Sequence, residues 1–266
     1  MKKKISIILA LMLCISLLAG CSTGSKGKDD SLDSVKKAGV IKVGLSDDYP
    51  PMEFRDKDNK IAGFDIDVAN AVAKKLGVKL QIVTNAYDGI FLRLILKKFD
   101  FVQSTVSITD DRKKKMLFSD PYINGGCAIF LKTGDNSIKS PDDLKGKVVG
   151  CQAGTTSQDA LSKLSGLKDV KKYEATTDAF LDLQNGRIAA VVADPMVGDY
   201  YMVKNPGKFK KVEKYLGKEP IGAAFRKNDK ALKDAYQKAY NELKKDGAIS
   251  KISNKWFGYD VTKSDN

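Results

Sequence analysis

Residues 63–83, GFDIDVANAVAKKLGVKLQIV, predict a helix that leads directly into a strand. Four apolar residues recur with the spacing of one helical face: Ile66, Ala69, Val72 and Leu76. Asp65 is expected to cap the start of this helix, and Gly77 to end it, because glycine readily adopts the left-handed backbone that closes helices. The apolar run at 78–83 then predicts a strand.

The same alternation continues on both sides of this unit. Further strands are expected at 40–45, 101–104, 147–152 and 188–193, and further helices at 89–98, 156–164, 177–185, 231–245 and just before Gly258. Asp88 is expected to cap the helix at 89–98, and Ser140 with Pro141 to open a short one. Such alternation predicts an α/β fold with mostly parallel sheets.

The N-terminus predicts export. Three lysines precede an apolar run at 5–18, which is shorter than the roughly 20 residues that a membrane-spanning helix needs, so residues 1–20 are interpreted as a signal peptide. The sequence Leu18-Ala19-Gly20-Cys21 resembles the bacterial lipobox, which implies a diacylglyceryl group on Cys21. An ordinary signal peptide cut nearby is the alternative. Residues 21–37 are expected to be a lipidated flexible tether to the extracytoplasmic face of the membrane.

Composition excludes several functions. The net charge is +13, yet an exported protein rarely meets nucleic acid, so most lysines are interpreted as solvated surface. Histidine is absent, which removes the commonest general base and metal ligand, and no nucleotide-binding glycine motif occurs. No cofactor or metal is therefore expected. In the mature chain Cys127 and Cys151 could form a disulfide or remain two free thiols.

Polar and aromatic residues gather where the predicted strands end, the edge at which open α/β sheets bind small molecules. The candidates are Ser46, Tyr49, Tyr87, Ser104, Thr105, Ser107, Gln152, Thr155, Thr156 and Asp194, with Gln103 at the rim. Arg112 follows a helix start capped by Thr109, and its planar guanidinium matches a carboxylate. Asp194 suits an ammonium group. Together the two charges describe an α-amino acid, although Arg112 alone could be a surface cation and Asp194 a helix cap.

Seven segments, in this order and spacing, carry a resemblance to the extracellular solute-binding proteins of polar amino-acid ABC transporters, family 3. They are Tyr49-Pro50-Pro51-Met52-Glu53-Phe54, Gly63-Phe64-Asp65-Ile66-Asp67, Ser107-Ile108-Thr109-Asp110-Asp111-Arg112, Phe118-Ser119-Asp120-Pro121-Tyr122, Asp143-Leu144-Lys145-Gly146-Lys147, Ala153-Gly154-Thr155-Thr156 and Lys255-Trp256-Phe257-Gly258. The resemblance covers residues 40–258.

The resemblance implies a two-lobe, type II periplasmic-binding-protein-like fold with two hinge crossings, near Gly125 and Pro220. Lobe 1 would comprise residues 38–125 and 221–260, lobe 2 residues 126–220, and 261–266 a C-terminal tail. The ligand would lie between the lobes, with its carboxylate on Arg112, its ammonium on Asp194 and its side chain between Tyr49 and Tyr87.

The implied function is capture of a polar L-amino acid by a monomer that delivers it to an ABC permease with a separate ATPase subunit. At Ser46 relatives often place an aspartate, whereas here acidic charge moves to Asp47 and Asp48, which are expected to face solvent. This departure favours neutral polar ligands, cystine included, over lysine or arginine. A receptor for a signalling partner, a surface adhesin, and a cleft enzyme such as a dehydratase are the alternatives, but no pair of carboxylates or catalytic triad emerges.

Overall fold

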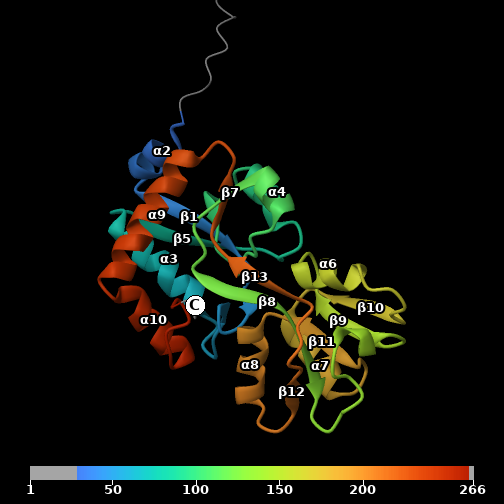
Figure 1. Ribbon diagram of the computed structural model, residues 1–266. Helices are drawn as coiled ribbons and strands as arrows, with labels where there is room; N and C mark the ends of the chain where they lie inside the picture. Colours follow the sequence, from blue (N-terminus) through green and yellow to red (C-terminus); the bar gives the residue numbers. More distant parts are fainter. Residues whose placement is uncertain (1–28, 264–266) are drawn as a thin grey trace, which may run out of the picture.

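The structure is a computed structural model, and it describes residues 29–263 (Figure 1). The predicted signal peptide, Cys21 and the first part of the predicted tether lie outside the described residues, as do the last three residues of the predicted tail. Within the described part of the chain, none of the helices has both the length and the apolar character needed to cross a bilayer. The described residues build two lobes, each around its own sheet.

The first lobe contains the predicted helix–strand unit. Its elements are α2 (Ser31–Ala38), β1 (Val40–Leu45), β2 (Asp48–Tyr49), β3 (Glu53–Arg55), β4 (Ile61–Ala62), α3 (Phe64–Lys75), β5 (Lys79–Thr84), α4 (Ile90–Ile95), β6 (Phe101–Val102), α5 (Asp110–Lys115), β7 (Met116–Phe118), β14 (Ala224–Arg226), α9 (Lys230–Lys245) and α10 (Ala248–Phe257). The strand order is β5-β1-β6-β14-β7. The first three strands run parallel, as predicted, whereas β14 is antiparallel to both of its neighbours.

The second lobe is built from the middle of the chain. Its elements are β8 (Ile123–Lys132), the 3-10 helix η1 (Pro141–Leu144), β9 (Val148–Gln152), α6 (Thr156–Ser162), β10 (Asp169–Tyr173), α7 (Thr176–Gln184), β11 (Ala190–Ala193), α8 (Pro195–Lys204), β12 (Phe209–Lys211) and β13 (Gly217–Ile221). Strands β10, β9 and β11 are parallel, and β8 joins them antiparallel. The expectation of mostly parallel sheets therefore holds for three adjacent strands of each sheet and fails on the side of β14 or β8.

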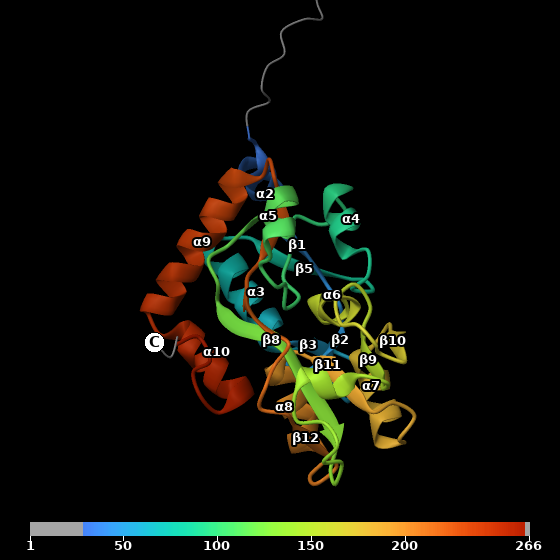
Figure 2. The same ribbon diagram turned by 45° about the vertical axis from the view of Figure 1, so that its right-hand side comes forward.

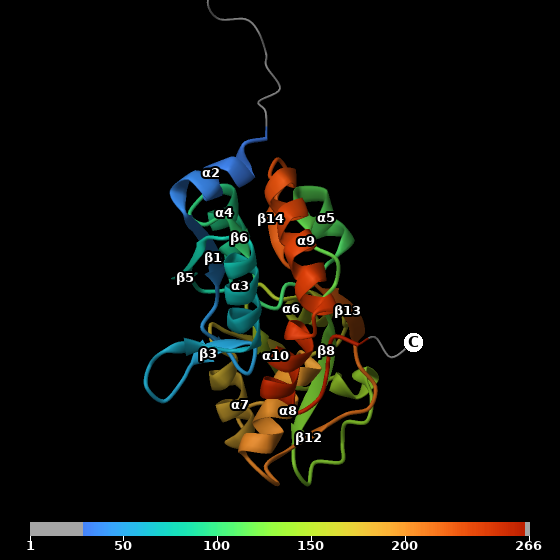
Figure 3. The same ribbon diagram turned by 90° about the vertical axis from the view of Figure 1, so that its left-hand side faces the viewer.

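Strands β8 and β13 connect the two lobes. They pair antiparallel from Ile123 opposite Ile221 to Cys127 opposite Gly217. Figure 2 shows β8 running from the first lobe down into the sheet of the second, and Figure 3 shows β13 beside it at the same level. This pair contains both predicted crossing points, Gly125 and Pro220. The lobe boundaries at 125–126 and 220–221 stay a prediction that this pairing supports.

Two predicted helix caps are wrong. Gly63 caps α3 and Gly89 caps α4, and neither helix has a side-chain cap, so Asp65 and Asp88 do not serve as predicted. The Asp65 side chain lies inside the lobe, where it accepts hydrogen bonds from the Thr105 N–H and the Tyr122 hydroxyl. A carboxylate this well satisfied by interior donors has no reason to return to the helix end. Ser140 does open its short helix, through a capping box with Asp143.

The predicted tether is wrong for residues 31–37, which belong to helix α2. Val35 buries its side chain, and the Asp29 carboxylate and Ser31 hydroxyl accept hydrogen bonds from the first N–H groups of α9, at Ala231 and Leu232. A segment that looks polar in sequence is ordered here because it satisfies the free N–H groups of another helix.

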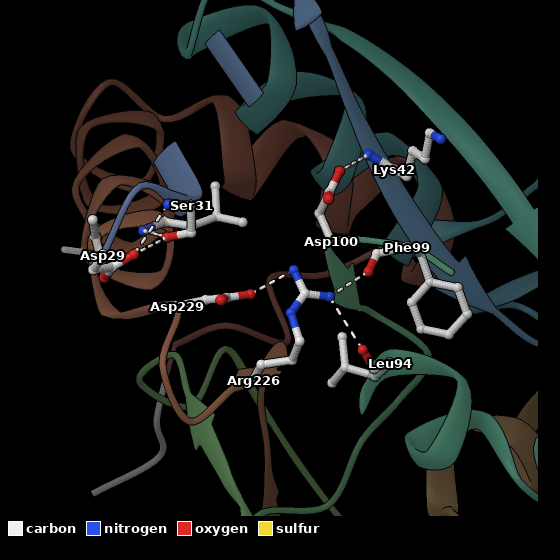
Figure 4. A network of polar contacts seen from close by, with 10 residues as sticks. Asp29, Ser31, Lys42, Leu94, Phe99, Asp100, Arg226 and Asp229 are labelled. Atoms are coloured by element: carbon white, nitrogen blue, oxygen red, sulfur yellow. Dashed lines mark hydrogen bonds and ion pairs between the residues drawn. The ribbon is translucent and has the colours of Figure 1, made fainter. Parts of the chain in front are cut away.

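A buried ion pair ties α9 to the sheet of the first lobe (Figure 4). The Arg226 guanidinium lies 2.5 Å from Asp229 and donates hydrogen bonds to the carbonyls of Leu94 (3.1 Å) and Phe99 (2.6 Å). Both charged side chains are less than 15% exposed. The pair thereby holds the end of α4 and the start of β6 against the turn between β14 and α9.

Replacing Arg226 with alanine should lower the free energy of unfolding by about 3 kcal/mol, since it leaves Asp229 and two carbonyls unpaired in a buried place. Urea denaturation measures the change. The matched control is Lys75→Ala, which removes a largely exposed pair with Glu242 and should cost less than about 1 kcal/mol. Equal losses for the two variants would contradict this account of the pair.

Candidate ligand-binding site

A small cavity of about 10 Å³ lies between the lobes. Nine residues line it: Tyr49, Tyr87, Ser104, Thr105, Ser107, Gln152, Thr155, Thr156 and Asp194. All nine are residues that the sequence analysis placed at strand ends. They meet because the carboxyl ends of β1, β6, β9 and β11 all face this cavity from the two sheets.

Asp194 makes a buried polar contact between the two lobes. Its Oδ2 accepts a hydrogen bond from the Tyr49 hydroxyl (2.9 Å), and its own N–H donates to that hydroxyl (3.2 Å). Its Oδ1 accepts from the Gly126 N–H of the crossing strand (2.8 Å). A Cβ on Gly125 would stand 2.3 Å from Oδ1, so the strand approaches this closely only with glycine at 125.

The surroundings of Asp194 weaken its acidity. Burial raises its pKa to about 6, against the opposing effects of the Gly126 N–H, the Tyr49 hydroxyl and Arg112. Asp194 precedes Pro195 at the start of α8, but its side chain makes no cap hydrogen bond with that helix. The carboxylate is therefore directed into the interface between the lobes, and a cationic group placed beside it would restore its usual acidity.

Arg112 spans the cleft from the opposite corner. Its guanidinium donates to the carbonyls of Ser107 (3.0 Å), in its own lobe, and Gly154 (3.4 Å), in the second. The Phe91 ring lies 4.8 Å from the guanidinium carbon and supports it by a cation–π contact. Thr109 caps α5 as predicted, accepting from the Arg112 N–H. The carbonyls take only part of the five N–H donors of an arginine, so the others remain for an anion.

Further contacts cross the cleft. The Ser107 and Thr156 hydroxyls lie 3.2 Å apart, and the Gln152 amide donates to Asp48 (3.0 Å). Asp48 also accepts from the Ser46 hydroxyl. The expectation that Asp48 faces solvent is thus wrong, because Gln152 and Ser46 draw it into the interface and burial raises its pKa. Asp47 instead pairs with Arg55 at 2.6 Å.

Three predicted site residues lie near the cavity without lining it. Ser46 is buried and donates its N–H to Ser104. Arg112 lines a neighbouring hollow between the lobes that it shares with Thr156. Gln103 is buried beneath the cavity floor, where its amide contacts Asp65 and Tyr236. The roles assigned to these side chains in ligand binding stay predictions.

The structure adds two acids that the sequence analysis did not place. Glu53 and Asp65 lie fully buried beneath Ser104 and Thr105, and burial raises the pKa of both. Neither lines the cavity, so the expectation that no catalytic pair of carboxylates emerges in the cleft stays a prediction. Both were noted in sequence, Asp65 as a helix cap and Glu53 only in passing. They are 12 positions apart on different elements, and no local spacing reveals that they meet.

The cysteine question is settled by geometry. Cys127 and Cys151 are both free and buried, on β8 and β9. Burial raises the pKa of the Cys127 thiol to about 12 and that of Cys151 to about 11, so neither is a ready nucleophile near neutral pH.

Comparison with known proteins places this geometry in a family. Residues 41–259 match the bacterial extracellular solute-binding proteins, family 3. The chain is 36% identical to the L-cystine-binding protein TcyJ of Escherichia coli K12 over 95% of each chain, and 36% identical to the L-cystine-binding protein TcyA of Bacillus subtilis 168 over 98% of this chain and 100% of that one.

A solved structure described as an ancestral arginine-binding protein bound to arginine superposes with a TM-score of 0.78 at 44% identity, over 83% of this chain and 99% of that one. The match to the family extends over both lobes and both crossing strands. The chain belongs to the bacterial extracellular solute-binding proteins of family 3.

Proposed function

We propose that this chain captures a polar L-amino acid outside the cytoplasm and delivers it to an ABC importer, working as a monomer on a permease and its ATPase subunit. The observation that carries the proposal is a pair of opposite charges in the cleft, with Asp194 lining the cavity and the Arg112 guanidinium lining the neighbouring hollow. A zwitterion matches both at once. The relatives named as cystine-binding and the solved arginine-binding protein are amino-acid binders of this family.

Ligand capture follows from contacts that only the closed arrangement makes. The amino acid would bind mainly the first lobe through Arg112 and the hydroxyls of the β6 end, and Asp194 with the loop before α6 would then reach it from the second lobe. A ligand shifts such an equilibrium by its differential affinity for the two states, and these contacts supply that difference. A permease that recognises the closed state would thereby recognise the loaded protein.

The lining favours a neutral polar ligand. Asp194 is the carboxylate among the nine described residues that line the cavity, and it is assigned to the ammonium group. A lysine or arginine side chain would need a further acid, whereas Asp48 already accepts from Gln152 and Ser46. Glu53 and Asp65 are covered by Ser104 and Thr105, which favours binding over acid–base catalysis.

A thermal-shift screen of the twenty common amino acids with cystine and ornithine tests the proposal. A neutral polar amino acid or cystine should raise the melting temperature most, and calorimetry should then give one site per chain. No stabilisation by any of them, or conversion of a candidate to a product detected by mass spectrometry, would contradict it.

Replacing Arg112 with alanine should weaken binding of the identified amino acid more than 100-fold, because two charge-assisted hydrogen bonds to the carboxylate, each worth roughly 1.5–3 kcal/mol, are lost. Calorimetry measures the loss, and Arg112→Lys, which keeps the charge without the fork, should bind with intermediate affinity. Affinity within a few fold of wild type in Arg112→Ala would remove this side chain from the anion site.

Binding should weaken as the pH falls below about 6. Asp194, whose pKa burial raises to about 6, must be ionised to pair with the ammonium, so the ligand favours the deprotonated form and the dissociation constant should rise about fivefold from pH 6 to pH 5. Asp194→Asn should bind weakly and lose this dependence. An unchanged pH profile in that variant would assign the titration to another group, such as Asp65.

We also propose that the protein is anchored through a lipid on Cys21. Replacing Cys21 with serine should release the protein from the membrane fraction, since several acyl chains on one residue hold a protein stably and none would remain. Mass spectrometry of the wild-type N-terminus should show a lipidated cysteine, and Cys127→Ser is the control that leaves anchoring intact. An unmodified N-terminus at or beyond Ser22 would contradict the assignment.

A further inference from the structure

The cavity floor is formed by Ser104 and Thr105, and both of their hydroxyl protons already take part in hydrogen bonds within the protein. Ser104 Oγ donates to Glu53 Oε1 (2.8 Å), and Thr105 Oγ1 donates to Glu53 Oε2 (3.2 Å). Ser104 Oγ in turn accepts the Ser46 N–H (3.0 Å). A hydroxyl has one proton and two lone pairs, so Ser104 keeps one lone pair and Thr105 keeps two for any ligand in the cavity.

Asp65 holds the backbone of the cavity floor from beneath. Its carboxylate accepts from the Thr105 N–H (2.8 Å), the Tyr122 hydroxyl (3.0 Å) and the Gln103 amide (3.4 Å), and it hydrogen-bonds to Glu53. Both acids are at most 1% exposed. Thr105 itself has a φ of 49°, a left-handed conformation that is costly for a β-branched residue and that the Asp65 contact helps to hold.

The direction holds for an ionised Glu53, because a carboxylate only accepts hydrogen bonds. It also holds for a neutral Glu53 whose proton is directed at Asp65. In both cases the hydroxyl protons of Ser104 and Thr105 point toward Glu53, away from the cavity.

Two lining residues of the second lobe also have all their side-chain donor protons in hydrogen bonds within the protein. The Gln152 amide nitrogen donates to Asp48 and to the Glu174 carbonyl, both at 3.0 Å, which leaves its oxygen as an acceptor. Thr155 donates its hydroxyl proton to the Gln152 carbonyl (2.7 Å). Four lining residues, Ser104, Thr105, Gln152 and Thr155, therefore offer the cavity acceptors and no free donors from their side chains.

Other groups in and beside the cavity offer donors. Arg112, in the neighbouring hollow, has N–H groups to spare, and the Tyr87 hydroxyl of the cavity lining can donate its proton. Ser107 and Thr156 share one hydrogen bond between two hydroxyls, so one of their two protons also remains. The cleft thus has one group of donors, suited to the ligand carboxylate, and one group of acceptors.

We propose that the buried Glu53–Asp65 pair is a positioning element that makes the cavity floor a hydrogen-bond acceptor surface, so that the chain takes amino acids whose side chains carry N–H or O–H donors and rejects acidic ones. The inference rests on the proposed function and narrows its ligand class. Amide and hydroxyl side chains and the second ammonium group of cystine meet the requirement. A glutamate or aspartate side chain would set its oxygens against acceptor oxygens, which costs affinity because neither group is then paired.

The test compares ligands in wild type and in Glu53→Gln. Calorimetry gives the dissociation constants of glutamate, of aspartate and of the tightest-binding amino acid in the screen. In wild type the two acidic amino acids should bind at least 100-fold more weakly than the tightest. In Glu53→Gln an amide N–H replaces one acceptor, so one floor hydroxyl must turn its proton into the cavity. The ratio between the dissociation constants of the acidic amino acids and that of the tightest ligand should then fall at least tenfold.

The control is Asp67→Asn, the same isosteric change two residues from Asp65, at a carboxylate that contacts Lys255 and Trp256 on the surface. This variant should leave the ratio of the dissociation constants unchanged. A Glu53→Gln variant that folds, by its circular dichroism and melting curve, but weakens all ligands equally would show a merely structural role and overturn the inference.

If Glu53→Gln does not fold, the variant Ser104→Ala tests the inference instead. Loss of one floor acceptor should weaken the tightest donor-bearing amino acid about tenfold and leave glutamate unchanged, whereas equal weakening of both would overturn the inference. Failure of the proposed function is distinguishable from failure of this inference. If no amino acid binds wild type, the function is wrong; if glutamate or aspartate binds as tightly as any other, only the inference is wrong.

Discussion

The Asp194 carboxylate joins three parts of the chain, and the closed arrangement of the lobes depends on it. One oxygen accepts from Tyr49 of the first lobe, the other from Gly126 of the crossing strand, and the residue itself lies where β11 passes into α8 of the second lobe. A buried carboxylate with few partners is costly, and burial accordingly raises the pKa of Asp194 to about 6. A ligand ammonium would reduce that cost while touching both lobes. The same group would therefore bind the ligand and make lobe closure favourable.

The floor of the cavity shows a second use of buried charge. Glu53 and Asp65 contribute little area, yet they fix the direction of the hydrogen bonds made by Ser104 and Thr105. Fully satisfied buried polar networks are rigid because each group has one arrangement that pairs all others. In this chain such a network lies beneath residues that line the cavity, so under the proposed function its rigidity would bear on ligand specificity as well as on stability.

Much of the fold and of the candidate site was predictable because both depend on patterns among residues that are close together in the sequence. Alternating apolar runs gave the strands at β1, β5, β9 and β11, and the polar residues after them line the cavity because strand ends converge. The predictions that failed concern contacts between residues that are far apart in the sequence. Asp65 has the sequence of a helix cap, yet tertiary donors at Thr105 and Tyr122 hold it inside. Helix α2 is ordered by α9, some 200 residues away, and β14 runs antiparallel because the chain returns from the second lobe.

The most direct measurement is a crystal structure of the protein grown with the amino acid that stabilises it most. The account predicts that the ammonium nitrogen lies within hydrogen-bond distance of the Asp194 carboxylate and that the carboxylate lies on the Arg112 guanidinium, with both lobes in contact with the ligand. A head group bound elsewhere, or held by one lobe alone with Asp194 still paired only to Tyr49 and Gly126, would contradict it.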